Sequence, residues 1–156
     1  MKIALRKISD ERHALDVTRD DHTREHAECE SRSLLVHDLL HFAIESEARL
    51  TGGFWGNLAR GTTLADLKAI GMTMADAVPE MAMIERIVGA LTGAVKGESA
   101  SHLVTALRGH AETLDWPMPE WLTEDFVVAV QERMRQLLGR WRATPYGGSM
   151  ELDWWV

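Results

Sequence analysis

Four side chains that could bind a metal or move a proton lie close together in the sequence: His37, Asp38, His41 and Glu45. His37 and His41 are four positions apart, which places two imidazoles on one face of a helix, the geometry by which helical histidine pairs bind zinc. Glu45 follows four positions later, about 40° further round the helix, as a third ligand or a partner of the ligands. The pattern allows a divalent-metal site, with zinc as the candidate ion and His37, His41 and Glu45 as ligands. Asp38, which could orient an imidazole or act as a general base, and Glu45 are the candidate catalytic residues.

This ligand set is incomplete, because metal sites use three or four ligands that converge well. A missing ligand would come from a second copy of the chain or from another part of it: His13, His22, His26, His102, His110 or Cys29. Two alternatives need no metal. The four polar groups could form the solvated side of an amphipathic helix, which the wide apolar arc opposite them favours, or a hydrogen-bond network between subunits.

The helix that carries these groups is predicted over residues 33–50. Ser31 or Ser33 is the expected N-cap, and the glycines at 52 and 53 are expected to end the helix. Apolar side chains recur through it at helical spacing and form a broad arc opposite the histidines: Leu35, Val36, Leu39, Leu40, Phe42, Ala43, Ile44 and Leu50. This helix is therefore expected to be the central element of the core.

Alternating residues before this helix predict three short strands, at 2–8, 13–19 and 24–30. The third has few apolar residues and is expected at a sheet edge. Residues 150–156 alternate again. A lone strand is not stable by itself, so we expect this last one to join the N-terminal strands.

Further helices are predicted from their start and stop residues. A short helix over 64–70 ends at Gly71, and another begins at Pro79. The next helix begins at Ser99 or Ser101 and carries His110 on its apolar side, and Thr123 caps the last one. Residues 1–156 are thus expected to form one α+β domain: a small antiparallel sheet, with three N-terminal strands and a C-terminal strand, packed against about four main helices.

The central stretch also resembles a known group of sequences. It reads HDLLHFAIE at 37–45 and GGFWG at 52–56. It resembles an uncharacterised bacterial protein family whose members have a short β-rich start and an HDLxHxxxE helix followed by a GGFWG turn. This resemblance implies no activity and no ligand set, but it directs attention to His37, His41 and Glu45.

Composition limits the classes of function. The chain has 156 residues and a formal net charge of −7, so we expect no binding to nucleic-acid phosphates. Cys29 is the single cysteine, which excludes an intramolecular disulfide and favours a reducing compartment. Charges at residues 2, 6 and 7 replace the apolar run of a signal peptide, and no run approaches the roughly 20 apolar residues of a membrane span. We therefore expect a soluble cytoplasmic protein without membrane contact.

Two kinds of function follow from these patterns. Trp154 and Trp155 point to opposite faces of the last strand, so one is expected to be exposed. This favours an interaction or structural module that forms a homo-oligomer. The alternative is a metal-binding protein or metal-dependent hydrolase that uses His37, His41 and Glu45. A small ligand bound in the crevice between the sheet and the helices, suggested by residues 52–55, is a third hypothesis, and the sequence does not decide whether the protein is an enzyme.

Overall fold

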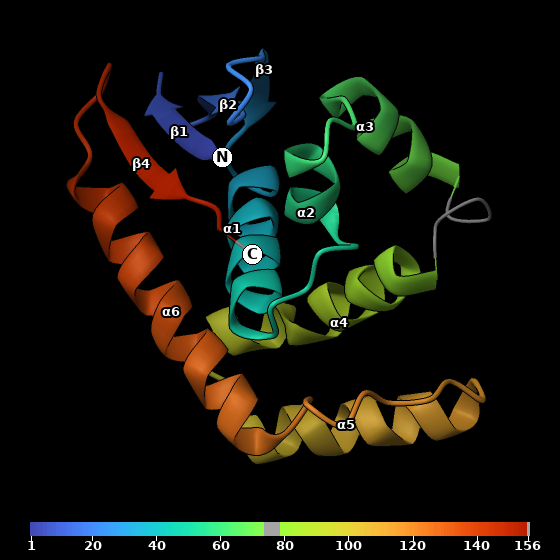
Figure 1. The fold of residues 1–156 in the computed structure, drawn as a ribbon. Coiled ribbons are helices and arrows are strands. Elements are labelled where there is room, and N and C mark those ends of the chain that lie inside the picture. Colours follow the sequence, from blue (N-terminus) through green and yellow to red (C-terminus); the bar gives the residue numbers. More distant parts are fainter. Residues whose placement is uncertain (74–78, 156) are drawn as a thin grey trace.

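The computed structural model describes residues 1–73 and 79–155, with only the backbone described for residues 70–73 (Figure 1). Four strands form one antiparallel sheet in the order β3-β2-β1-β4. The C-terminal strand therefore joins the N-terminal ones, as predicted, and Ile3 lies opposite Leu152 in this pairing. The strands are β1 (Lys2–Lys7), β2 (Arg12–Thr18), β3 (Arg24–Glu30) and β4 (Ser149–Asp153).

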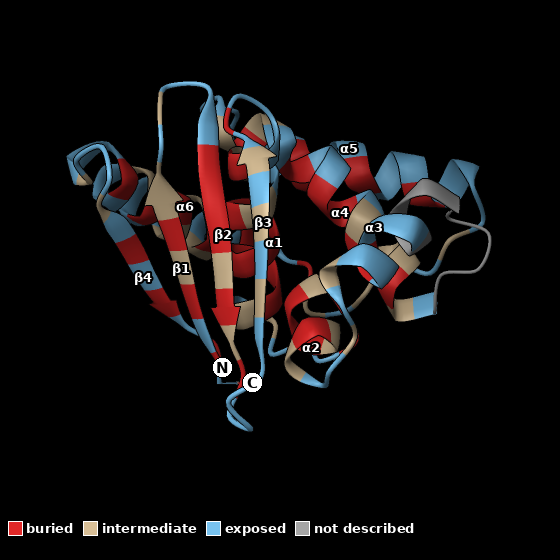
Figure 2. Cartoon of the chain, turned by 90° about the horizontal axis from the view of Figure 1, so that it is seen from above, coloured by how far each residue is buried: buried red, intermediate tan, exposed pale blue. Residues whose placement is uncertain are grey.

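The helices lie on one face of this sheet (Figures 1 and 2). Within the described ranges they are α1 (Leu34–Glu47), α2 (Phe54–Ala59), α3 (Leu64–Thr73), α4 (Pro79–Val95), α5 (Ala100–Thr113) and α6 (Glu124–Ala143). Of these, α1, α4, α5 and α6 have 14 or more residues each and are the main helices. The predicted α+β architecture is confirmed. No helix in the described ranges has the length and apolar character that crossing a bilayer requires.

The buried face of the sheet comes from β1, β2 and β4, and β4 contributes Met150 and Leu152. Ile3 and Leu5 of β1 and Leu15 and Val17 of β2 are buried beneath the helices, as strand alternation requires. Every residue of β3 is at least partly exposed, which agrees with its predicted place at an edge. The sheet therefore forms one wall of the core, and the helices close the other side.

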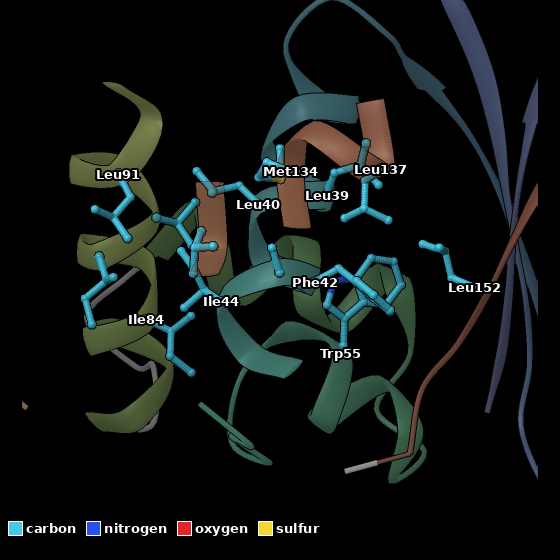
Figure 3. Packing of buried hydrophobic residues seen from close by; sticks show 14 of the residues in the cluster. Leu39, Leu40, Phe42, Ile44, Trp55, Ile84, Leu91, Met134, Leu137 and Leu152 are labelled. Carbon is cyan, nitrogen blue, oxygen red and sulfur yellow. The ribbon is translucent and has the colours of Figure 1, made fainter. Parts of the chain in front are cut away.

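Helix α1 lies at the centre of the molecule, in contact with α6, α4, α2 and β3 (Figure 1). Most of its predicted apolar arc is buried. Figure 3 shows Ile44 directed towards Ile84 of α4, and Phe42 beside Trp55 of α2. The rings of Phe42 and Trp55 meet edge to face with centroids 6.1 Å apart, a favourable aromatic geometry. The expectation that this helix is the core's central element is confirmed.

The polar side of α1, opposite the apolar arc, is not the solvated surface that the sequence favours. His41 and Glu45 are both buried, although His37 is exposed. Glu45 bonds to the start of α2, and His41 faces Glu85 of α4, so these two helices cover this side. The pattern within α1 could not reveal this cover, because it comes from α2 and α4, which lie outside that helix.

The helix ends agree with prediction at Ser99 and Thr123 and differ at the glycines at 52, 53 and 71. Ser99 and Thr123 accept hydrogen bonds from the first turns of α5 and α6. The glycines at 52 and 53 do not end α1, which stops at Glu47 and is followed by Arg49 in the left-handed region (φ 53°). α3 continues through Gly71, since one glycine costs a helix only about 1 kcal/mol.

The prediction that His110 lies on the apolar side of its helix, and so in the core, is wrong. This residue is exposed on α5. The buried stripe of that helix consists of Leu103, Val104, Leu107 and Ala111, and His110 falls at its border.

Candidate metal centre

Two helices bring three potential ligands together. His37 and His41 come from α1, and Glu85 comes from α4; their ligand atoms all lie within 4.8 Å of one another. His41 Nε2 is 3.3 Å from Glu85 Oε1, and His37 Nε2 is 3.7 Å from Glu85 Oε2. Zn²⁺ bonds of about 2.0–2.1 Å in a tetrahedron require ligand atoms about 3.4 Å apart. The three groups are therefore close to the spacing that one ion needs.

The packing of α4 on α1 explains why Glu85 reaches the histidines. The buried residues of α4 include Ile84, Ile87, Val88 and Leu91, and they lie at helical spacing. Glu85 follows Ile84 at the border of this stripe, so its carboxylate comes out along the contact between the helices. There it meets the polar side of α1.

Exposure falls steeply from one ligand to the next. The side chain of His37 is 44% exposed and that of Glu85 is 21% exposed, whereas that of His41 is 2% exposed. The site therefore has a buried end at His41 and an end accessible to solvent at His37.

His41 presents a buried nitrogen that lacks a hydrogen bond. Nε2 of His41 has no hydrogen-bond partner in the described structure, because the nearby Glu85 oxygen does not meet hydrogen-bond geometry. In the protonated imidazole this nitrogen is paired electrostatically with Glu85, but in the neutral imidazole its lone pair is buried without a partner, which is costly. A metal ion bound to Nε2 would satisfy it.

Glu45 is not in the converging group of three, which has Glu85 in its place. Its Oε1 accepts from His41 Nδ1 at 2.9 Å and from the backbone N–H of Phe54 at 2.9 Å. Its Oε2 accepts from the backbone N–H of Trp55 at 3.0 Å. This arrangement corresponds to the second role that the sequence offered for Glu45, a partner that holds a ligand from behind.

Asp38 lies beside the centre. Its Oδ1 is 3.6 Å from Nδ1 of His37, which is too far for a hydrogen bond but close enough for electrostatic attraction. The backbone carbonyl of Asp38 accepts from the indole N–H of Trp55 at 3.2 Å. Asp38 is thus held near His37 by α1 and contacts α2 through its backbone.

The charges in the centre stabilise one another. Asp38 and then Glu85 raise the pKa of His37 to about 9. Burial opposes protonation of His41, but Glu45 and Glu85 outweigh it and its pKa is raised. Burial likewise opposes ionisation of Glu85, but His37 and His41 outweigh it and bring its pKa to about 2. A metal ion must therefore displace protons from the imidazoles, so its affinity should rise with pH.

The other predicted ligands lie elsewhere. His13 is buried beside Ser31, His26 pairs with Asp16, and His102 pairs with Glu98. His22 and His110 are exposed, and Cys29 is half-buried, with its thiol pKa raised by that burial. In the described part of the chain, His37, His41 and Glu85 form the single group of three with metal-binding geometry. The third member of this group is Glu85, which the sequence does not predict.

Comparisons of the chain with models of protein families, with curated proteins and with solved structures gave no match. The resemblance to the bacterial family with the HDLxHxxxE helix therefore stays a prediction. Function has to be argued from the geometry of the centre.

Proposed function

We propose that this protein binds one divalent metal ion, with zinc as the candidate, through His37, His41 and Glu85. The observation that carries the proposal is the buried Nε2 of His41, which lacks a hydrogen bond and faces the other two ligands. Two imidazoles and a carboxylate are a donor set that zinc favours. Support from Glu45 on the far side of the His41 ring adds the outer contact that metal-bound histidines usually have.

Three protein ligands leave one position of a tetrahedral ion open, as in catalytic zinc sites. A bound ion would act there as a Lewis acid and lower the pKa of a water molecule, which is the chemistry of a metal-dependent hydrolase. Asp38 is the candidate to accept a proton, because it lies beside His37 at the exposed end. Both oxygens of Glu45 are occupied and buried, so Glu45 fits the role of a holding group better than that of a base.

Metal content and affinity test this proposal. Protein purified without a histidine tag is analysed for bound metals, and metal-free protein is titrated with zinc chloride at pH 7.5 by calorimetry. We expect one ion per chain. We also expect at least ten-fold weaker binding in the His41→Ala and Glu85→Gln variants.

The matched control is His102→Ala, which removes an exposed histidine of α5 that pairs with Glu98 and should leave the affinity unchanged. Circular dichroism shows whether each variant is folded. Absence of zinc binding would contradict the proposal, as would equal affinity in the wild type, His41→Ala and Glu85→Gln.

A second proposal follows from the C-terminal end of the chain. Trp155 is 82% exposed, whereas its neighbour Trp154 is 3% exposed. A large exposed aromatic side chain is typical of interfaces, and it supports the self-associating interaction module that the sequence favours. The expected partner is a second copy of the chain. Sedimentation should show a dimer that Trp155→Ala shifts towards monomer, and a strict monomer at high protein concentration would contradict this.

A further inference from the structure

Glu45 joins the metal centre to the start of α2. Its side chain is fully buried and lies between His41 on its own helix and the first two residues of α2, Phe54 and Trp55. All three of its hydrogen bonds are 2.9–3.0 Å long. A buried carboxylate with good partners on two sides is fixed in position, since moving it would leave several groups unpaired.

These contacts determine which nitrogen of His41 is available. A carboxylate only accepts hydrogen bonds, so the proton in the His41–Glu45 contact belongs to Nδ1. The lone pair of a neutral His41 ring is then on Nε2, the atom that faces His37 and Glu85. Glu45 thereby selects the one tautomer that can bind a metal at this site.

The structure also shows why Glu45 needs α2 to hold this position. Two of its three partners are backbone N–H groups of the first turn of α2. Gly53, the N-cap of that helix, leaves the carboxylate its space, because a Cβ there would lie 2.6 Å from Oε1 and closer still to Cδ and Oε2. The ring of Phe54 lies over His41, with centroids 5.9 Å apart. If the first turn of α2 opens, Glu45 loses most of its support.

We infer that Glu45 is a positioning residue that couples occupation of the His37–His41–Glu85 centre to closure of the first turn of α2. This inference rests on the metal binding proposed above. Coupling between two sites is reciprocal: whatever factor the closed turn adds to metal affinity, bound metal adds to the stability of the closed turn. Loss of an outer partner of a metal-bound histidine typically costs 10–100-fold in affinity. Zinc should therefore make opening of this turn rarer by a factor of the same order.

Amide hydrogen exchange measures this coupling directly, because the N–H groups of Phe54 and Trp55 are the ones that Glu45 accepts from. We expect saturating zinc to slow exchange of these two amides about 10–100-fold in the wild-type protein. The amide of Leu103, bonded to Ser99 in α5, is the internal reference and should slow much less.

Two variants separate positioning from simple loosening of the turn. Glu45→Gln should weaken zinc binding about 10–100-fold and abolish the zinc-dependent protection. Asn57→Ala removes the side chain that donates to the carbonyls of Gly52 and Gly53, so it loosens the same turn without touching Glu45. It should speed exchange of the two amides yet keep zinc affinity within about two-fold, because the turn stays mostly closed.

The outcomes distinguish this inference from the proposed function. If zinc binds but the amides of Phe54 and Trp55 exchange at the same rate with and without it, the coupling is refuted while metal binding stands. If Asn57→Ala loses as much affinity as Glu45→Gln, the effect of Glu45 is general loosening and the positioning role is refuted. If wild-type protein binds no zinc, the proposed function fails and this inference fails with it. The exchange experiment on the wild-type protein tests the coupling between zinc binding and the first turn of α2 even if Glu45→Gln does not fold.

Discussion

Replacing Gly53 by alanine should destabilise the protein through a contact that the sequence does not reveal. The backbone of Gly53 is extended (φ −82°, ψ −167°), so alanine could adopt it without strain. The difficulty is space. The new methyl group would lie 2.6 Å from Oε1 of Glu45 and closer to the rest of the carboxylate, so that carboxylate must move.

The size of the effect follows from what this movement breaks. Glu45 would give up at least one buried hydrogen bond, to Trp55 or His41, at about 1 kcal/mol or more. Overpacking of a fully buried site adds about 1–3 kcal/mol. We expect a loss of about 3 kcal/mol in the free energy of unfolding, which for a domain of this size lowers the Tm by about 6–12 °C.

Urea unfolding and thermal melting followed by circular dichroism measure this loss. The matched control is Gly109→Ala on α5, where an added Cβ meets nothing within 4 Å. It should stabilise the protein by about 0.5–1 kcal/mol, because alanine favours helix over glycine. If Gly53→Ala is as stable as the wild type, Glu45 is not fixed beneath α2 and the reasoning about this site is wrong.

Three further predictions test the core and the charges. Trp55→Ala, which empties a fully buried site, should cost about 3–5 kcal/mol in urea unfolding, whereas Val128→Ala at an exposed site should cost less than about 0.5 kcal/mol; equal costs would show that the core is wrongly placed. Burial lowers the pKa of His13, so its contribution to stability is present above about pH 6.5 and is lost as the pH falls below that value. Its NMR titration should lie below 6.5, and a titration above 6.5 would contradict the buried placement. The pKa of His37 is raised to about 9, so its contribution in metal-free protein is present below about pH 6.5 and is lost as the pH rises towards 9. The His37→Gln variant should lack that part of the alkaline loss in urea unfolding with EDTA, and an unchanged pH dependence would refute the ion pairs.

Much of the fold could be predicted because it depends on local patterns. The alternation of Ile3 and Leu5 identifies a buried strand face, and the apolar arc of α1 identifies a core helix. Ser99 and Thr123 marked the starts of α5 and α6 because a hydroxyl before a helical pattern caps its first turn. Each of these features is decided by neighbours within a few residues.

The centre could be predicted only in part, because its other half comes from a distant helix. The spacing of His37 and His41 predicts that their rings share one face of α1, and their centroids lie 4.6 Å apart. Glu85 follows His37 and His41 by more than forty residues in the chain. A single sequence does not show how α4 packs on α1, and this packing brings the Glu85 carboxylate to the histidines. For the same reason the burial of His41 and Glu45 was missed, since α2 and α4 cover a face that is polar in sequence.

The most direct test of metal binding by this protein is X-ray diffraction from a crystal grown with zinc, measured at the zinc absorption edge. We expect an anomalous peak between α1 and α4, about 2.0–2.1 Å from Nε2 of His41, with His37 and Glu85 as the other protein ligands. A zinc-containing crystal with no peak at this position, or with zinc bound only at other sites, would contradict the proposal.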